Sequence, residues 1–126
     1  MSKSILSTTN APGAIGPYSQ GISIGDLVFT SGQIPINPVD GKVVSDDIRK
    51  ATAQSLENVK AILTEAGTSM ENVIKTTIFL KDLNDFAAVN EVYGEYFKTN
   101  FPVRSCIQVA KLPMDVLVEI EVIAIK

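Results

Sequence analysis

The chain has 126 residues, with 11 basic and 14 acidic side chains, a formal net charge of −3, one cysteine and no histidine. Without histidine, the chain has no Ser-His-Asp triad, no Cys-His dyad and almost none of the known catalytic zinc arrangements, and a lone cysteine excludes an internal disulfide or a Cys-pair metal site. The acidic balance, with no block of Lys and Arg, argues against nucleic acid as a main partner, because phosphate binding needs a local surplus of positive charge.

The N-terminal third of the chain predicts short strands separated by loops. Apolar runs bounded by Gly, Pro and Asn are typical of strands between turns. Gly25-Asp26 lies between two such runs and indicates a tight hairpin turn. The expected strands are residues 4–8, 20–24 and 27–31, and the expected loops are residues 10–17 and 35–41.

The middle of the chain predicts a long amphipathic helix. Ser45, Asp46 and Asp47 each offer an N-cap, and acidic side chains suit the positive end of the helix dipole. Apolar residues then recur at helical spacing as far as Ala66, and Gly67 supplies the stop. This pattern indicates one buried stripe along the helix.

A strand and a second helix follow. Residues 72–80 are β-branched and aromatic, which is typical of a strand. Asp82 or Asn84 can cap the second helix, which has to end before Phe101-Pro102. Its expected apolar face consists of Phe86, Val89, Tyr93, Tyr96 and Phe97.

The C-terminal quarter predicts two strands, residues 104–109 and 116–125, joined by residues 110–115. The resulting order is β-β-β-α-β-α-β-β. A mixed six-stranded sheet with two helices on one face satisfies this order, so the predicted fold class is α+β and the length fits one domain over residues 1–126.

The last strand has two different faces. Its alternate residues form one purely apolar set, which is suited to packing under helices: Val116, Val118, Ile120, Val122 and Ala124. The other set mixes acids with apolar residues: Leu117, Glu119, Glu121, Ile123 and Ile125. Two interpretations remain open for this second face. Either another subunit covers it, or it is an exposed face with ordinary polar alternation.

A pairing of the last two strands would bring chemistry-bearing residues together. Matching their apolar faces sets Cys106 opposite Glu119 and Arg104 opposite Glu121. We therefore expect Arg104, Cys106, Glu119 and Glu121 on one side of the sheet. A shift of one residue in the register would change this pairing.

Each of these residues has a functional and a structural interpretation. Arg104 could capture a carboxylate through two parallel hydrogen bonds, or it could form a structural ion pair with Glu119 or Glu121. Glu119 could act on water as a general base. Cys106 has no histidine to activate it, so a small buried residue is the simpler interpretation than a nucleophile.

Several segments form a set of motifs spread in order along all 126 residues. The C-terminal motif consists of residues 102–107, 110–112 and 118–120, with sequences PVRSCI, AKL and VEI. The earlier motifs are GPYSQ at 16–20, TSGQIP at 30–35, QSLENV at 54–59 and KDLNDF at 81–86, followed by Val89-Asn90 and Tyr93. Together these segments resemble the RidA family of reactive-intermediate deaminases, also called the YjgF family.

This resemblance implies a chorismate-mutase-like homotrimer whose sheets face inward and whose three clefts lie between neighbouring subunits. It implies hydrolysis of reactive enamines and imines, such as 2-aminoacrylate and 2-aminocrotonate from serine and threonine dehydratases, to 2-oxo acids and ammonia. The expected enzyme is therefore a 2-iminobutanoate/2-iminopropanoate deaminase that needs no metal and no organic cofactor. The expected ligand is a small imino acid, enamino acid or 2-oxo acid.

The resemblance also assigns residues to the site. It implies that Arg104 holds the substrate carboxylate and that Glu119 positions and activates the attacking water. The substrate-binding positions that it implies are Tyr18, Ser31, Gly32, Asn90, Arg104 and Cys106. Among these, Tyr18 would close the cleft from a loop, and Cys106 would contribute shape and backbone contacts.

Two other functions stay open at this point. One is a regulatory trimer that binds small carboxylates without turnover, and the other is an RNA-directed ribonuclease or translation inhibitor. No apolar run approaches the roughly 20 residues that span a bilayer, and the first residues lack the apolar core of a signal peptide. We therefore expect no membrane association and a reducing, cytoplasmic location.

Overall fold

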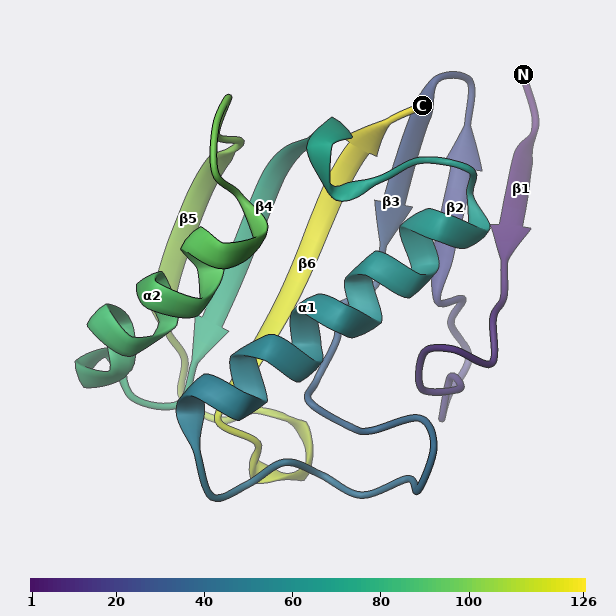
Figure 1. Cartoon of the computed structure of the whole chain (residues 1–126). Coiled ribbons are helices and arrows are strands. Elements are labelled where there is room, and N and C mark those ends of the chain that lie inside the picture. Colours follow the sequence, from purple (N-terminus) through teal and green to yellow (C-terminus); the bar gives the residue numbers. More distant parts are fainter.

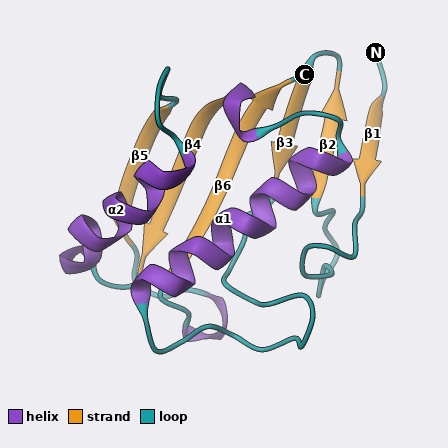
Figure 2. Cartoon of the chain, viewed as in Figure 1, coloured by secondary structure: helices purple, strands orange, loops and turns teal.

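The fold is built on one six-stranded sheet, which the computed structural model describes together with the rest of residues 1–126 (Figures 1 and 2). Its strand order is β1-β2-β3-β6-β4-β5. The β4–β5 pair is parallel and all other pairs are antiparallel. The strands are β1 (Lys3–Leu6), β2 (Gly21–Ile24), β3 (Leu27–Thr30), β4 (Val73–Leu80), β5 (Val103–Gln108) and β6 (Val118–Ile125).

Two helices, α1 (Ile48–Glu65) and α2 (Phe86–Tyr96), lie side by side on the same face of the sheet (Figure 1). This arrangement confirms the predicted α+β architecture and the predicted order of elements. No helix combines the length and the apolar composition that a membrane span requires.

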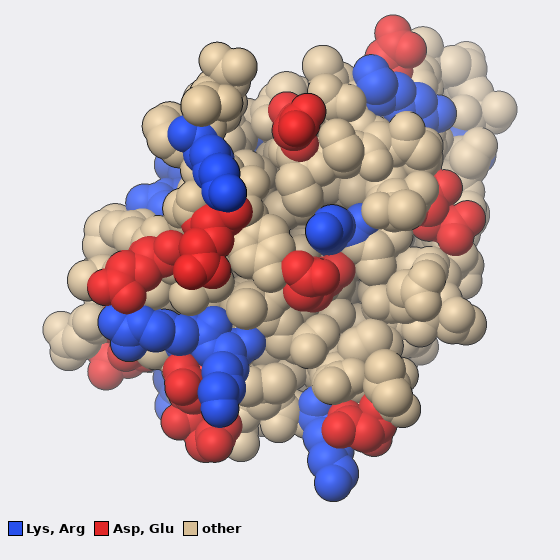
Figure 3. All heavy atoms as spheres, in the orientation of Figure 1, with Lys and Arg blue, Asp and Glu red and all other residues tan.

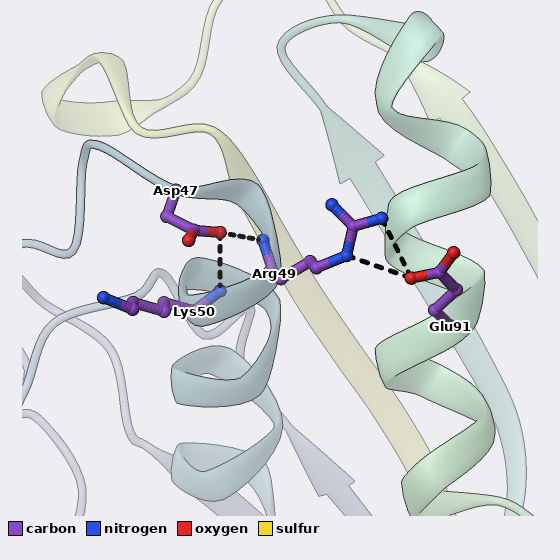
Figure 4. Close-up of polar contacts among 4 residues, drawn as sticks. All are labelled: Asp47, Arg49, Lys50 and Glu91. Atoms are coloured by element: carbon purple, nitrogen blue, oxygen red, sulfur yellow. Dashed lines mark hydrogen bonds and ion pairs between the residues drawn. The ribbon is translucent and has the colours of Figure 1, made fainter.

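The ends of α1 follow the sequence signals. Asp47 is the N-cap, and its carboxylate accepts hydrogen bonds from the backbone N–H groups of Arg49 at 2.8 Å and Lys50 at 3.3 Å (Figure 4). Gly67, just past the helix, has φ +82°, a left-handed conformation that glycine adopts without steric cost. Arg49 also reaches across to Glu91 on α2, with Nη2 2.9 Å from Oε2.

The hydrophobic core lies between the helices and the sheet. It consists of 19 buried residues, and the alternation predicted for the last strand is confirmed, because Val118, Ile120, Val122 and Ala124 all belong to it. The opposite face of the sheet has no helix over it. Apolar side chains there are exposed, among them Ile5, Leu27, Phe29, Ile107 and Ile125.

The expected pairing of the last two strands is wrong. β4 lies between β5 and β6, pairing with β5 in parallel and with β6 in antiparallel orientation. The physical reason is that β4, α2 and β5 form a strand-helix-strand unit, in which the helix carries the chain back over the sheet so that the two strands run parallel. β6 then pairs with the free edge of β4 and with β3.

Candidate active site

Arg104 lies on β5 and its side chain reaches towards α2 on the helix side of the sheet. Its Nη1 donates a hydrogen bond to Oδ1 of Asn90 at 2.8 Å. The guanidinium carbon lies 4.8 Å from the ring centroid of Tyr93 and 5.4 Å from that of Phe86. These contacts place the cation against two aromatic faces and one amide oxygen.

No carboxylate pairs with Arg104. The ion pairs of the chain are Arg49–Glu91 and Lys81–Asp115, so the structural ion pair of Arg104 with Glu119 or Glu121 does not form. A guanidinium carries five N–H donors, and only one contact to Asn90 uses them here. The exposed side chain is therefore free to bind a carboxylate with two parallel hydrogen bonds.

Cys106 follows two residues later on the same side of β5. Burial raises the pKa of its thiol, and the neighbouring Arg104 lowers it by less than burial raises it. A thiol of this kind stays protonated near neutral pH and is a poor nucleophile. This agrees with a role for Cys106 in the shape of the site.

Glu119 lies on β6, on the opposite side of the sheet, next to the segment that follows β3. Gln33 and Ile120 exchange backbone hydrogen bonds of 2.7 and 3.1 Å, which brings residues 31–33 alongside β6. The Glu119 carboxylate then lies directly against Gly32. A Cβ on Gly32 would overlap Oε2 and lie only 2.7 Å from Cδ of Glu119.

Two effects raise the pKa of the Glu119 carboxyl. Burial raises its pKa above the usual value, and the nearby Glu121 carboxylate raises it further. A carboxylate whose basicity is raised in this way accepts a proton from water more readily than an exposed one does. The position suits a general base.

Ser31 connects this segment to the loop that carries Tyr18. The Ser31 hydroxyl donates to the carbonyl of Ser19 at 2.6 Å, and its N–H donates to the carbonyl of Gln20 at 2.9 Å. Tyr18 is half-exposed; it lines one surface hollow with Gly32 and another with Ser31. Tyr18, Ser31, Gly32 and Glu119 therefore form one neighbourhood.

The loop itself is fixed from beneath by Gln20, whose side chain is buried. The Gln20 amide accepts from the N–H of Thr8 at 2.7 Å and donates to the carbonyls of Thr8, Ala11 and Pro12. The sequence did not indicate this role of Gln20, because its hydrogen-bond partners lie several residues away from it in the chain.

The predicted site residues thus fall into two groups. We call Asn90, Arg104 and Cys106 the arginine half-site, and Tyr18, Ser31, Gly32 and Glu119 the glutamate half-site. Along the sheet, Arg104 pairs with Thr76 on the helix side, whereas Glu119 pairs with Phe79, whose side chain points to the other face.

The expectation that Arg104, Cys106, Glu119 and Glu121 share one side of the sheet is therefore wrong. Two strand spacings, about 10 Å, separate the backbones of β5 and β6, and the side chains point away from one another. One small molecule cannot contact both half-sites of the same chain. The largest hollow in the chain, about 850 Å³ between the N-terminal segment and residues 36–41, contains Tyr18 but neither Arg104 nor Glu119.

The structure also adds Phe86 and Tyr93 to the surroundings of Arg104. Both were expected on the apolar face of the second helix, and neither was expected in the site. Tyr93 is buried, but Phe86 is 39% exposed. Their spacing with Asn90, four and three residues, is the one signal in the sequence that could have indicated a common role. No group of three or more acidic or cysteine side chains is arranged to hold a metal ion.

The fold and the site define an α+β protein with an arginine that no carboxylate pairs and a partly buried glutamate of raised pKa, and comparison with known proteins gives its family. Residues 8–126 match the profile described as Endoribonuclease L-PSP. The chain belongs to this family, which is the RidA (YjgF) family.

Individual relatives are similar over nearly their whole length. A protein from Salmonella typhimurium named 2-iminobutanoate/2-iminopropanoate deaminase is 54% identical over 129 residues, which cover 100% of this chain and 99% of the relative. A RutC family protein from Pasteurella multocida is 56% identical over 126 residues, with 97% of each chain covered. The solved structure of Escherichia coli TdcF with bound serine has a TM-score of 0.94 and 52% identity, and the match covers 98% of both chains.

Proposed function

We propose that this chain is a deaminase that hydrolyses reactive enamine and imine intermediates, such as 2-aminoacrylate and 2-aminocrotonate, to 2-oxo acids and ammonia. The observation that carries the proposal is Arg104, an arginine that no carboxylate of the chain neutralises and whose remaining N–H donors are free. The name of the Salmonella typhimurium relative and the serine bound to Escherichia coli TdcF support the same substrate class, a small molecule with one carboxylate.

We propose further that the active unit is a homotrimer. In a ring of identical subunits, the arginine half-site of one copy can face the glutamate half-site of the next, which is a head-to-tail contact that closes after three copies. The separation of the half-sites within one chain supports this arrangement. The exposed apolar side chains on the helix-free face of the sheet, such as Leu27 and Phe29, support an interface there.

The reaction then needs orientation of the substrate and one group that relays protons. The enamine first takes a proton from water on its carbon and becomes the iminium ion, R–C(=NH₂⁺)–COO⁻, which is the protonated imine. Arg104 holds the carboxylate, and Glu119 accepts a proton as water attacks the imine carbon, so that a C–O bond forms and the C=N electron pair moves to nitrogen. The neutral amino alcohol takes this proton back from Glu119 on its nitrogen. The C–N bond then breaks to release ammonia, and the hydroxyl proton passes to the Glu119 carboxylate as the C=O bond of the 2-oxo acid forms.

The other site residues have supporting roles in this proposal. Tyr18 closes the cleft from its loop, and Ser31 and Gly32 line the pocket, with Gly32 allowing the Glu119 carboxylate to lie close to the backbone. Asn90 orients Arg104, and Cys106 shapes the pocket. The scheme uses no metal and no organic cofactor, and we propose that it operates in the cytoplasm, where a single free cysteine stays reduced.

An RNA-directed activity is the second candidate because the family carries the description Endoribonuclease L-PSP. The charge distribution argues against it. On the face that carries the helices, acidic and basic side chains alternate and form no basic stripe (Figure 3), and the net charge is −3. RNA binding through phosphate contacts would weaken steeply with salt, so a binding titration at two salt concentrations tests this candidate.

The main proposal is tested by coupling the purified protein to a serine or threonine dehydratase and following formation of the 2-oxo acid. We expect acceleration by the wild-type protein and by Arg49→Ala, a matched control that removes the only other arginine, and we expect none by Arg104→Ala. No acceleration by the wild type, or full activity of Arg104→Ala, would contradict the proposal. Binding of a 2-oxo acid without turnover would favour the regulatory trimer instead.

A further inference from the structure

Three side chains on one face of α2 surround the guanidinium of Arg104. Phe86, Asn90 and Tyr93 follow one another at intervals of four and three residues, so they form a single stripe along the helix. Asn90 accepts the hydrogen bond from Nη1, and the two rings lie within about 6 Å of the guanidinium carbon, the range of a cation–π contact. The stripe therefore contacts the cation on several sides.

The Tyr93 ring is held rigidly. Its side chain is only 7% exposed, and its hydroxyl lies 2.8 Å from Oγ1 of Thr76. Thr76 is the residue of β4 that pairs with Arg104 on β5. The Tyr93 ring is therefore bonded to the strand next to the one that carries Arg104. Phe97 packs against the Tyr93 ring, with the two centroids 4.5 Å apart. A ring fixed in this way can hold a cation in one place.

Every partner of Arg104 in this stripe is neutral. Burial raises the pKa of the Tyr93 hydroxyl, so the group stays protonated. Glu91, which follows Asn90 on the helix, has its carboxylate bound by Arg49 of α1 with an Nη2–Oε2 distance of 2.9 Å and does not pair with Arg104 (Figure 4). The positive charge of Arg104 is thus left uncompensated within the chain.

We infer that Phe86, Asn90 and Tyr93 form a neutral cradle for Arg104, in which Phe86 and Tyr93 are positioning residues that preset the guanidinium for the carboxylate of a 2-imino or 2-oxo acid. This inference rests on the proposed function and deepens it. The cradle fixes the direction of the guanidinium N–H groups before the ligand arrives, which lowers the entropy lost on binding. Because the cradle carries no negative charge, it does not compete with the ligand carboxylate.

The cradle makes a specific prediction about steady-state kinetics. The substrate carboxylate keeps its charge throughout the reaction, so the cradle contributes equally to ground-state and transition-state binding, and its loss raises KM without changing kcat. We expect Tyr93→Leu to raise KM, and the inhibition constant of the product 2-oxobutanoate, by about tenfold, with kcat within about threefold of wild type. A merely structural role for Tyr93 would lower the folded fraction, and therefore kcat, and leave KM unchanged.

Three further variants complete the test. Tyr93→Phe keeps the ring and loses only the bond to Thr76, so its KM should stay within about threefold of wild type. Tyr96→Leu, the same chemical change on the part of α2 that contacts Glu57, is the matched control with unchanged KM. Asn90→Asp places a carboxylate at the 2.8 Å contact and should raise KM by about tenfold or more, because the new ion pair neutralises Arg104.

The outcomes separate the cradle from the proposed function. If the wild type neither accelerates the coupled reaction nor binds 2-oxobutanoate, the proposed function fails. If the wild type is active but Tyr93→Leu and Asn90→Asp both keep the wild-type KM and inhibition constant, the cradle is refuted. Should Tyr93→Leu fail to fold, Phe86→Leu replaces it, because the Phe86 ring is 39% exposed and its loss costs little core packing; an unchanged KM there refutes the cradle equally.

Discussion

Gly32 is the position at which one added methyl group should lower the rate of catalysis and leave the stability of the fold nearly unchanged. The Glu119 carboxylate lies against the Gly32 Cα, where no side chain stands in its way. In Gly32→Ala the new Cβ would overlap Oε2 and lie 2.7 Å from Cδ, well inside the 3.4 Å at which ordinary contacts begin. The carboxylate therefore has to leave its place.

The size of the effect follows from which atoms must move. The obstructing atoms belong to the far end of a flexible, half-buried side chain, so Glu119 can rotate away and the free energy of unfolding should fall by less than about 1 kcal/mol. The carboxylate is displaced by about 1 Å or more, and a catalytic group misplaced by about 1 Å can lose about 100-fold in rate. We therefore expect kcat/KM to fall about 100-fold in a protein of nearly normal stability.

The assay is the coupled formation of 2-oxo acid, run beside thermal unfolding and binding of 2-oxobutanoate. Binding should persist, because the proposed contact of the product carboxylate is with Arg104 and not with Glu119. Gly94→Ala on α2 is the matched control, since a Cβ there meets no atom within 4 Å, and it should keep full activity. Full activity of Gly32→Ala would refute the role assigned to the position of the Glu119 carboxylate.

Three other predictions follow from the two half-sites and the loop beside them. Arg104→Lys keeps the charge but loses the planar fork, so KM should rise about tenfold. The rate should fall as the pH drops through the raised pKa of Glu119, because the proposed base must be deprotonated. Glu121→Gln removes a charge that raises this pKa, so the acidic limb of the kcat/KM profile should move to lower pH. Gln20→Ala leaves the partly buried backbone groups that it binds without partners, which should cost about 2 kcal/mol in denaturant unfolding. An unmoved acidic limb, or an unfolding midpoint equal to that of the wild type, would contradict the corresponding argument.

The order of the elements and the content of the core could be predicted from the sequence. Helical spacing with three candidate caps at residues 45–47 and a stop at Gly67 located α1, and strict alternation identified the buried face of β6. These signals are local, since each depends on residues within one turn or one strand. They predict which face of an element is buried, whatever its neighbours are.

The arrangement of the strands could not be predicted in the same way. Consecutive strands are usually neighbours, which favoured a pairing of β5 with β6, but β4 pairs with both. The contact of Gly32 with Glu119 likewise depends on the bridge between Gln33 and Ile120, residues 87 positions apart in the chain. Pairing across such distances leaves no pattern in a single sequence, so one expected cluster became two half-sites.

The central claim is that deamination takes place between two copies of the chain, with Arg104 from one and Glu119 from the next. It is tested most directly by mixing Arg104→Ala and Glu119→Gln chains, each inactive alone, and measuring 2-oxo acid formation after they have been unfolded and reassembled together. Random assembly of equal amounts would give about a quarter of all clefts with both residues intact, so activity should return to about a quarter of the wild-type value. No recovery in trimers shown to contain both chains would contradict the claim.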